Sequence, residues 1–317
     1  MKNQSNKVIF FGNETLATGV ETTASTLRGL IDNKYDVVAV VINQNIIRSR
    51  SSNKSEVEKI AKKNNIAIFK PKKLSDIKSD LQEIKPDIGV LIAYGKIVPK
   101  EIINIFPLGI LNIHPSLLPK YRGSTPIEST ILNDDSTAGV SVMSLSEKTD
   151  EGPIYSQTTL KLNGNESKQE LANKLLEIGT DKLLEILPKV LDKSLRPTPQ
   201  DNKLATYTSQ IDKSSGKIDW TRSAQQIERE IRAYLEWPKS RTKLAEGDVI
   251  ITKAYSVPTM PLRGKPGDVE IVEQAGIIMV CTGNGSLCIE QLKPASKKIM
   301  TSAEFIRGYG NRIKKFS

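Results

Sequence analysis

The sequence predicts an α/β fold, in which a mostly parallel sheet with helices on both faces precedes a smaller domain of β-strands. Three observations support this prediction. The first half of the 317-residue chain alternates short apolar runs with segments of helical period. The last third consists of short runs separated by Gly and Pro. The length also exceeds what one hydrophobic core usually supports, so we expect two domains.

Five short apolar runs are expected to form the parallel sheet. Their hydrophobicity is continuous rather than alternating, which is typical of strands buried on both faces. The segments between them, such as 55–65 and 75–84, are amphipathic, as in βαβ units. The runs begin at Lys7, Val37, Ile66, Ile88 and Gly109. We therefore expect a Rossmann-like sheet.

The helices and the domain limits follow from local signals. Thr125, Pro126 and Glu128 provide an N-cap, a first-turn proline and a capping-box partner, so a helix is expected to start there. A long helix is predicted at about 167–191. We expect domain limits of 1–190 for the α/β domain, 191–208 for a Pro-containing polar linker and 209–317 for a small, OB-like β-barrel that opens with a helix at 223–235.

Composition restricts the class of protein. Hydrophobic residues make up 38% and charged residues 26%, which is typical of a folded chain, and no apolar run approaches the roughly 18 residues of a membrane helix. Cys281 and Cys288 flank a hairpin-like TGNGS and are expected to be buried strand residues, and we expect no metal site. We expect a soluble, cytoplasmic protein.

Positive charge is concentrated towards the C-terminus. The formal net charge is +10, and the residues from Ser209 onward carry 18 Lys and Arg against 12 Asp and Glu. Such an excess favours a polyanionic partner, nucleic acid above all, although a lysine-rich composition alone gives similar values.

The only histidine, His114, lies at the end of a predicted strand, two residues after Asn112. Ligands of open parallel sheets bind beyond the carboxyl ends of the strands, and residues two apart project to the same side. An amide beside an imidazole can stabilise an oxyanion and move a proton during acyl transfer. The alternative is a histidine that only hydrogen-bonds a loop.

Asp150 supplies a carboxylate at a second predicted strand exit, where Gly152 and Pro153 interrupt the strand-like run. It could orient His114 or take part in proton transfer. An aspartate in a loop is otherwise a common turn residue.

These residues resemble a known family. Asn112, His114, the SLLP segment from Ser116 and the DEGP segment from Asp150 are similar to the active-site pattern of formyltransferases that use 10-formyltetrahydrofolate. Segments 205–238 and 300–310 resemble the second domain of the methionyl-tRNA formyltransferase family, so the resemblance spans almost the whole chain.

The resemblance implies roles for individual residues. The amino group of methionine on initiator tRNA would attack the formyl carbon, Asn112 would hold the oxyanion, His114 would assist and move the proton, and Asp150 would orient His114 or relay the proton. The folate co-substrate would contact the chain around Tyr94, Gly95, Ser116, Leu117, Leu118 and Pro119. The resemblance implies no metal, and we expect a monomer that acts away from membranes.

The resemblance also implies where tRNA binds. A basic loop follows the second strand in the family, and here its place is taken by a segment with Arg48, Arg50 and Lys54, without the family's glycines and lysine pair. The second domain would bind phosphates by charge rather than reading bases. Its candidate residues are Arg229, Arg232, Lys239, Arg241, Lys297 and Lys298.

Three other functions were weighed. A formyltransferase for an amino sugar on a nucleotide would share Asn112, His114 and Asp150 but would not explain the C-terminal segments. A dinucleotide-dependent oxidoreductase would need G-x-G-x-x-G, which the glycine segment after the first strand lacks. A non-catalytic tRNA-binding protein would not need the three polar site residues.

Overall fold

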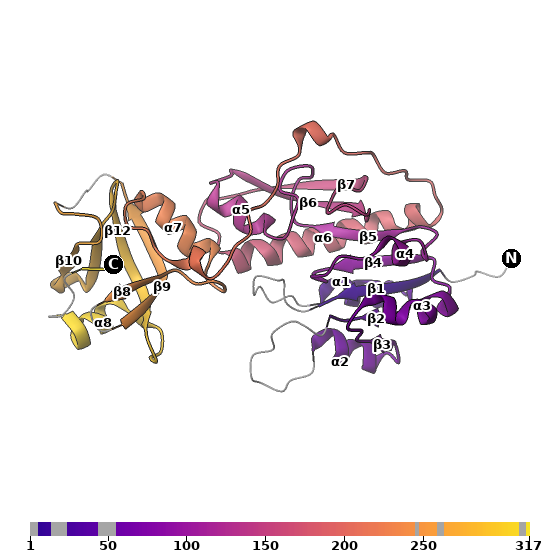
Figure 1. Ribbon diagram of the computed structural model, residues 1–317, viewed down its shortest axis with the longest axis horizontal. Coiled ribbons are helices and arrows are strands. Elements are labelled where there is room, and N and C mark those ends of the chain that lie inside the picture. Colours follow the sequence, from indigo (N-terminus) through magenta and orange to yellow (C-terminus); the bar gives the residue numbers. More distant parts are fainter. Residues whose placement is uncertain (1–5, 14–23, 44–54, 245–246, 259–262, 311–314) are drawn as a thin grey trace. The chain divides into compact units, whose positions relative to one another are not determined.

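The computed structural model describes residues 6–13, 24–43, 55–244, 247–258, 263–310 and 315–317 (Figure 1). The chain divides into two compact units. The first unit comprises Met1–Ile127, Ser136–Leu162 and Gln169–Ser209, and the second comprises Glu128–Asp135, Asn163–Lys168 and Gln210–Ser317. None of the helices in the described ranges is long and apolar enough to span a membrane.

A seven-stranded sheet forms the centre of the first unit. Its strands are β1 (Lys7–Gly12), β2 (Asp36–Val41), β3 (Ala67–Phe69), β4 (Ile88–Ile92), β5 (Ile110–His114), β6 (Thr137–Ser144) and β7 (Ile154–Lys161). The order is β3-β2-β1-β4-β5-β6-β7, with β1 to β5 parallel and β6 and β7 antiparallel. The predicted mostly parallel sheet is therefore confirmed, and the order reverses between β1 and β4.

Helices cover both faces of this sheet. In β1, Val8 and Phe10 pack into a core with residues of α1, α2 and α6, whereas Ile9 and Phe11 pack into a second core with residues of η1, α3 and α4. The helices of these two cores are α1 (Ser25–Asp32), α2 (Glu56–Lys63), η1 (Leu74–Ile77), α3 (Lys78–Ile84), α4 (Lys100–Ile103) and α6 (Lys168–Leu191), whereas most of α5 (Pro126–Leu132) belongs to the second unit. Burial on both faces explains why the strand sequences are continuously apolar.

An antiparallel sheet forms the core of the second unit. Its strands are β8 (Arg241–Leu244), β9 (Gly247–Val257), β10 (Val269–Val272), β11 (Ile277–Cys281), β12 (Ser286–Pro294) and β13 (Met300–Thr301). The order is β10-β11-β12-β9-β8, and β13 pairs with β12. Helices α7 (Ala224–Ala233) and α8 (Ser302–Tyr309) pack against this sheet, with η3 (Ser214–Gly216) and η4 (Glu273–Ala275) in its connections.

The last residues of the chain connect the two ends of this sheet. The backbones of Lys243, in β8, and Ser317 exchange hydrogen bonds of 2.8 and 3.1 Å. Next to Ser317, the Phe316 amide donates to the Gly267 carbonyl, close to the start of β10, at 2.9 Å. The Phe316 ring is 1% exposed and stacks on Trp220 with centroids 5.8 Å apart. The terminal segment thus gives the sheet the barrel-like closure that the sequence predicts.

Both cysteines are buried thiols that form no disulfide, in agreement with the sequence-based expectation. Burial raises the pKa of the Cys281 and Cys288 thiols. They are therefore neutral at physiological pH and act as small packing residues.

Residues 198–207, within the predicted linker of residues 191–208, make specific contacts within the first unit. Thr198 forms an isolated bridge with Ile154, and Tyr207 forms another with Arg122. The intervening chain includes the short helix η2 (Asn202–Leu204). Polar composition predicted a linker here, and it did not reveal these contacts.

Candidate active site

Asn112 and His114 lie at the carboxyl end of β5, near the point where the strand order reverses. Their neighbours Leu111 and Ile113 belong to the core beneath α6, so Asn112 and His114 project to the opposite face. Asn112 is 8% exposed and His114 is 5% exposed. Among the residues that the structure describes, none forms a hydrogen bond with the Asn112 side-chain amide. That amide can therefore serve a ligand.

The imidazole of His114 is held by one hydrogen bond. Its Nε2 lies 3.0 Å from the carbonyl oxygen of Tyr121. Because a carbonyl only accepts, Nε2 carries the hydrogen and donates it. The other ring nitrogen, Nδ1, lies 3.7 Å from Oδ1 of Asp150, which is too long for a direct hydrogen bond. Nδ1 is thus the nitrogen that can exchange a proton.

Asp150 is held facing His114 by the backbone. Its Oδ2 accepts a hydrogen bond of 2.8 Å from the Gly123 amide. Asp150 and Tyr121 have φ values of 54° and 59°, in the left-handed region, which costs a non-glycine residue about 1 kcal/mol or more. Such residues concentrate at functional sites, where surrounding contacts hold them in place.

Two polar side chains, one of them buried, hold the SLLP segment. Ser141 in β6 lies opposite His114, accepts from the Leu118 amide at 3.0 Å and donates to the Ser116 carbonyl at 2.6 Å. Gln157 in β7 donates to the Leu118 carbonyl at 2.8 Å. These backbone groups, which the sequence suggested for ligand binding, are therefore engaged within the protein.

Leu117 and Pro119, the other residues of the SLLP segment, are also held by contacts within the protein. Leu117 is half-buried, and its side chain lies so close to Gly139 that a Cβ there would come within 2.4 Å. The Pro119 carbonyl accepts a hydrogen bond from the Thr206 amide at 3.2 Å. The segment therefore forms a rigid wall next to His114.

Tyr94 and Gly95 follow β4, next to β5 in the sheet. The Tyr94 ring packs edge-on against Phe11, and burial raises the pKa of Tyr94 to about 12. Its phenol is therefore a core group, whereas Gly95 is exposed with a φ of 71°. Two residues further on, the side chain of Ile97 is 78% exposed. This exposed apolar residue is available to contact a flat ligand ring.

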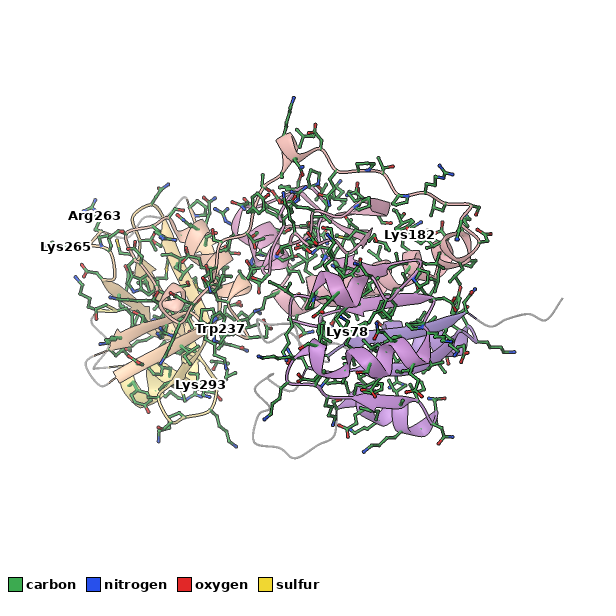
Figure 2. The ribbon with its side chains drawn as sticks, turned by 45° about the vertical axis from the view of Figure 1, so that its right-hand side comes forward. Lys78, Lys182, Trp237, Arg263, Lys265 and Lys293 are labelled. Carbon is green, nitrogen blue, oxygen red and sulfur yellow. The ribbon has the colours of Figure 1, made fainter. Side chains whose placement is uncertain are left out.

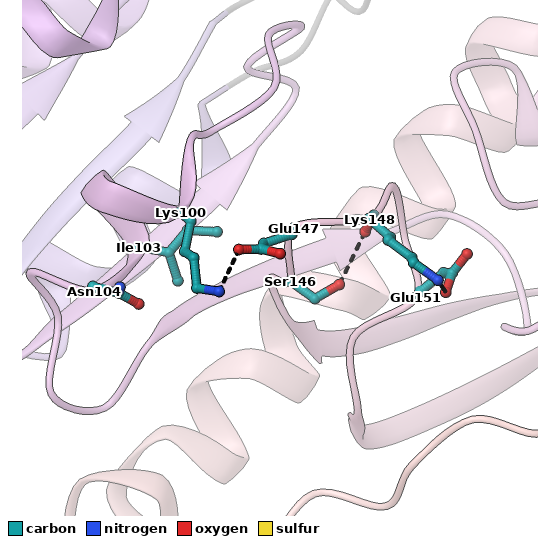
Figure 3. Close-up of a pocket in the computed structure, with 7 residues that line it drawn as sticks. All are labelled: Lys100, Ile103, Asn104, Ser146, Glu147, Lys148 and Glu151. Atoms are coloured by element: carbon teal, nitrogen blue, oxygen red, sulfur yellow. Dashed lines mark hydrogen bonds and ion pairs between the residues drawn. The ribbon is translucent and has the colours of Figure 1, made fainter.

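A surface pocket of about 470 Å³ adjoins the segment that leads into Asp150 (Figure 3). Its lysines are paired with carboxylates, since Lys100 Nζ lies 2.6 Å from Glu147 and Lys148 Nζ lies 3.7 Å from Glu151. The lining residues are Lys100, Ile103, Asn104, Ser146, Glu147, Lys148 and Glu151. Across the described ranges, no three His, Cys, Asp or Glu side chains gather closely enough to hold a metal ion.

Comparison with protein families identifies the chain. Residues 6–187 match the model of the formyl transferase family, and residues 210–310 match that of the formyl transferase C-terminal domain. The chain belongs to the formyl transferase family.

Curated relatives of this formyltransferase match it over nearly its whole length. A methionyl-tRNA formyltransferase from Magnetococcus marinus is 33% identical over 308 residues, covering 96% of each chain. A methionyl-tRNA formyltransferase from Sulfurihydrogenibium sp. is 35% identical, covering 96% of this chain and 97% of the relative.

Solved structures share the fold of this formyltransferase. An N-formyltransferase from Helicobacter canadensis, in complex with folinic acid and dTDP-3-aminofucose, has a TM-score of 0.68 at 22% identity and covers 90% of this chain and 98% of its own. HypX from Aquifex aeolicus has a TM-score of 0.67 at 17% identity and covers 98% of this chain and 48% of its own.

The basic residues expected to contact tRNA differ in their surroundings. Arg48, Arg50 and Lys54 lie outside the described residues. Arg229 forms a 2.8 Å ion pair with Asp134, and Arg232 donates to the Glu166 carbonyl at 2.9 Å. Burial lowers the pKa of the Arg232 guanidinium, against the effect of nearby Glu228. These two arginines therefore already have partners within the second unit.

Other cations of the second unit are more accessible. Lys239, Lys297 and Lys298 are exposed, and the half-buried Arg241 donates to the Lys213 carbonyl. Figure 2 labels three further basic residues of this unit, Arg263, Lys265 and Lys293. This formyltransferase thus carries free positive charge on its second unit.

Sequence reasoning missed several residues that shape the site. Arg122 is 1% exposed and follows Tyr121, whose carbonyl binds His114. Its guanidinium donates to Gln200, Asn202 and Tyr207, which come from the predicted linker. The polar Ser141 within a buried strand was a signal in the sequence for the support of the SLLP segment, but no such signal marked the Arg122 network.

Gly152 is required by close packing beside Asp150. A Cβ at this position would lie 1.8 Å from the Ser144 carbonyl oxygen, which is backbone and cannot rotate away. We expect Gly152→Ala to displace Asp150, to lower the rate of transfer about 100-fold and to reduce the free energy of unfolding by about 1–3 kcal/mol. Steady-state kinetics and urea denaturation would measure both effects.

Gly308→Ala is the matched control, because this exposed helical glycine in α8 has no atom within 4 Å of a built Cβ. It should keep full activity and gain up to about 1 kcal/mol of stability. Wild-type activity in Gly152→Ala would contradict the packing argument.

Proposed function

We propose that this formyltransferase transfers the formyl group of 10-formyltetrahydrofolate to the α-amino group of methionine on initiator tRNA. The observation that carries the chemistry is the Asn112 amide, which has no hydrogen-bond partner among the described residues, together with the nearby His114, whose Nδ1 faces Asp150 at 3.7 Å. The acceptor is suggested by the relatives, which match both units and are named methionyl-tRNA formyltransferases.

The reaction balances without oxidation or reduction. A bond forms between the amino nitrogen and the formyl carbon, the bond from that carbon to N10 of the folate breaks, and the proton lost by the amine is returned to N10. We assign the developing oxyanion to the Asn112 amide, which donates to it. His114 and Asp150 move the proton, because Nδ1 and Oδ1 are the free atoms that face each other.

The folate-derived donor is supported by the shape of the strand exits. A Cβ at Gly95 would meet only Asn43 Nδ2, at 3.8 Å, and the exposed Ile97 offers apolar contact to a pterin or benzoyl ring. We propose that the segments around Tyr94–Gly95 and Ser116–Pro119 form the walls of this site. They act mainly through their shape, because several of their backbone groups are bound internally.

The accessible lysines of the second unit are proposed to bind tRNA phosphates. Their attraction is independent of sequence and weakens as counterions compete. Arg229 and Arg232 would join this surface by exchanging internal partners, and Arg48, Arg50 and Lys54 would add charge from the segment after β2. We expect the monomer to suffice for this reaction.

The decisive experiment offers labelled 10-formyltetrahydrofolate together with one of three acceptors: methionyl initiator tRNA, methionyl elongator tRNA or a dTDP-linked amino sugar. We expect efficient labelling of the initiator only. Labelling of the sugar would establish the alternative acceptor, and tRNA binding without any transfer would establish a non-catalytic protein.

Salt dependence tests the phosphate contacts. We expect kcat/KM for methionyl-tRNA to fall roughly ten-fold or more between about 50 and 200 mM salt, because several phosphates must be neutralised. The KM for the folate serves as the internal control and should change little. A salt-independent kcat/KM for tRNA would contradict the proposed surface.

A further inference from the structure

Gln200 connects the two segments that hold His114 and Asp150. Its Oε1 accepts from Arg122 Nε at 3.1 Å and Nη2 at 2.9 Å. Its Nε2 donates to the carbonyls of Asp150 and Gly152, both at 2.7 Å. The orientation of the amide is unambiguous, because a guanidinium only donates and carbonyls only accept.

Arg122 makes this connection rigid. It lies between Tyr121, whose carbonyl holds His114, and Gly123, whose amide holds Asp150. The guanidinium is almost fully buried, with Glu151 3.5 Å away as its carboxylate partner. A buried charge with several hydrogen bonds has little freedom to move. Gln200 therefore hydrogen-bonds to a guanidinium that is itself held in place.

The backbone on both sides of the site needs such support. Tyr121, Gly123 and Asp150 all have φ in the left-handed region, at 59°, 117° and 54°. For Tyr121 and Asp150 this conformation is strained, and contacts from surrounding residues hold such residues in place. Gln200 provides two of these contacts, at the carbonyls of Asp150 and Gly152.

We propose that Gln200 is a positioning residue that sets the spacing between His114 and Asp150. It does so by fixing the Asp150–Gly152 backbone to Arg122 and hence to the 121–123 segment. The inference that this spacing matters for catalysis rests on the proposed formyl transfer, whereas the positioning itself does not.

Gln200→Glu is the most informative variant. Glutamate keeps an oxygen for Arg122 but replaces the donor with a second oxygen, which repels the carbonyls of Asp150 and Gly152. We expect kcat to fall on the order of 10- to 100-fold, with the KM values of both substrates within about three-fold of wild type. The matched control is Gln82→Glu on the exposed side of α3, where the same change meets no partner.

A double-mutant cycle with Asp150→Asn separates positioning from a general structural effect. If Gln200 acts through Asp150, adding Gln200→Glu to Asp150→Asn should lower kcat by less than about two-fold further. The proposal would be overturned if Gln200→Glu lowered kcat as much in the Asp150→Asn variant as in the wild-type protein. It would also be overturned if the single variant Gln200→Glu kept the wild-type kcat.

The single histidine provides a readout that needs no activity. All imidazole nitrogen signals in a ¹⁵N spectrum of the untagged protein belong to His114. At fixed pH, Gln200→Glu should move these signals in the same direction as Asp150→Asn, and Gln82→Glu should leave them in place. Unmoved signals in Gln200→Glu would overturn the positioning. Absent transfer by the wild-type protein would instead refute the proposed function.

Discussion

Asn112→Ala is expected to lower kcat for formyl transfer about 10²- to 10³-fold, because it removes a donor to the developing oxyanion. The same change should leave the fold intact. Within the described part of the chain, the Asn112 amide makes no hydrogen bond that its removal would break. A lower kcat with unchanged stability to unfolding is expected when the removed group interacts only with the transition state.

The measurement combines steady-state kinetics with thermal unfolding. Asn33→Ala, at the exposed C-terminal end of α1, is the matched control and should change neither kcat nor KM. A rate within a few-fold of wild type for Asn112→Ala would remove this residue from the mechanism. A similar loss accompanied by unfolding would show instead that the amide supports the fold.

His114→Ala should differ from Asn112→Ala in a way that the structure explains. Its imidazole donates to the Tyr121 carbonyl, so truncation removes a hydrogen bond within the protein. We therefore expect loss of rate together with a stability loss of about 1 kcal/mol, the net contribution of one hydrogen bond. Only the rate effect is informative about catalysis, and for this reason Asn112 is the better test of the site.

The parallel sheet could be predicted because its physical requirement is local. Strands covered by helices on both faces must be apolar at every position, and this leaves continuous runs that are visible in the sequence. The helix at 168–191 was equally visible, since its apolar residues recur with helical period over several turns. The starts of these features were placed within one residue of those observed, whereas the fourth run was expected to continue past the end of β4 at Ile92.

The pairing of His114 with Asp150 was accessible from the sequence as a hypothesis, although the rule of strand exits does not account for it, because β6 runs antiparallel to β5 and its carboxyl end at Ser144 lies opposite Leu111. The support from Arg122 and Gln200 was not accessible. These residues are 78 positions apart, and hydrogen bonds between distant polar side chains have no periodicity. Moreover, Gln200 lies in a polar segment with prolines, a composition that is typical of exposed connections.

A barrel was predicted, but the part that residues 315–317 play in closing it could not be seen in the sequence, for a similar reason. Phe316 follows a basic stretch, and no strand pattern marks it. Its role is evident only when the backbone of residues 315–317 is seen to bridge Gly267 and Lys243. A terminal aromatic residue thus completes a core whose other members are more than 20 residues away in the sequence or in α8.

Phe316→Ala is expected to lower the free energy of unfolding of the second unit by about 3–5 kcal/mol. The ring is 1% exposed and stacks on Trp220, so truncation leaves a cavity in the centre of the core. The loss should also loosen the bridge between β8 and the start of β10. This bridge is continued by Thr242, whose hydroxyl accepts from Trp220 Nε1 at 3.0 Å and donates to the Ser317 carbonyl at 3.2 Å.

Tryptophan fluorescence during urea denaturation can follow this unit specifically, because the two tryptophans of the chain, Trp220 and Trp237, both belong to it. Lys315→Ala is the neighbouring control. Its ammonium is half-exposed and pairs with Asp268 at 3.3 Å, so its removal should cost less than about 1 kcal/mol. If Phe316→Ala unfolds at the same urea concentration as this control, the terminal residues do not close the barrel. If Phe316→Ala instead causes a large loss of stability, and only in the unfolding transition that tryptophan fluorescence follows, residues 315–317 are part of the core of the second unit.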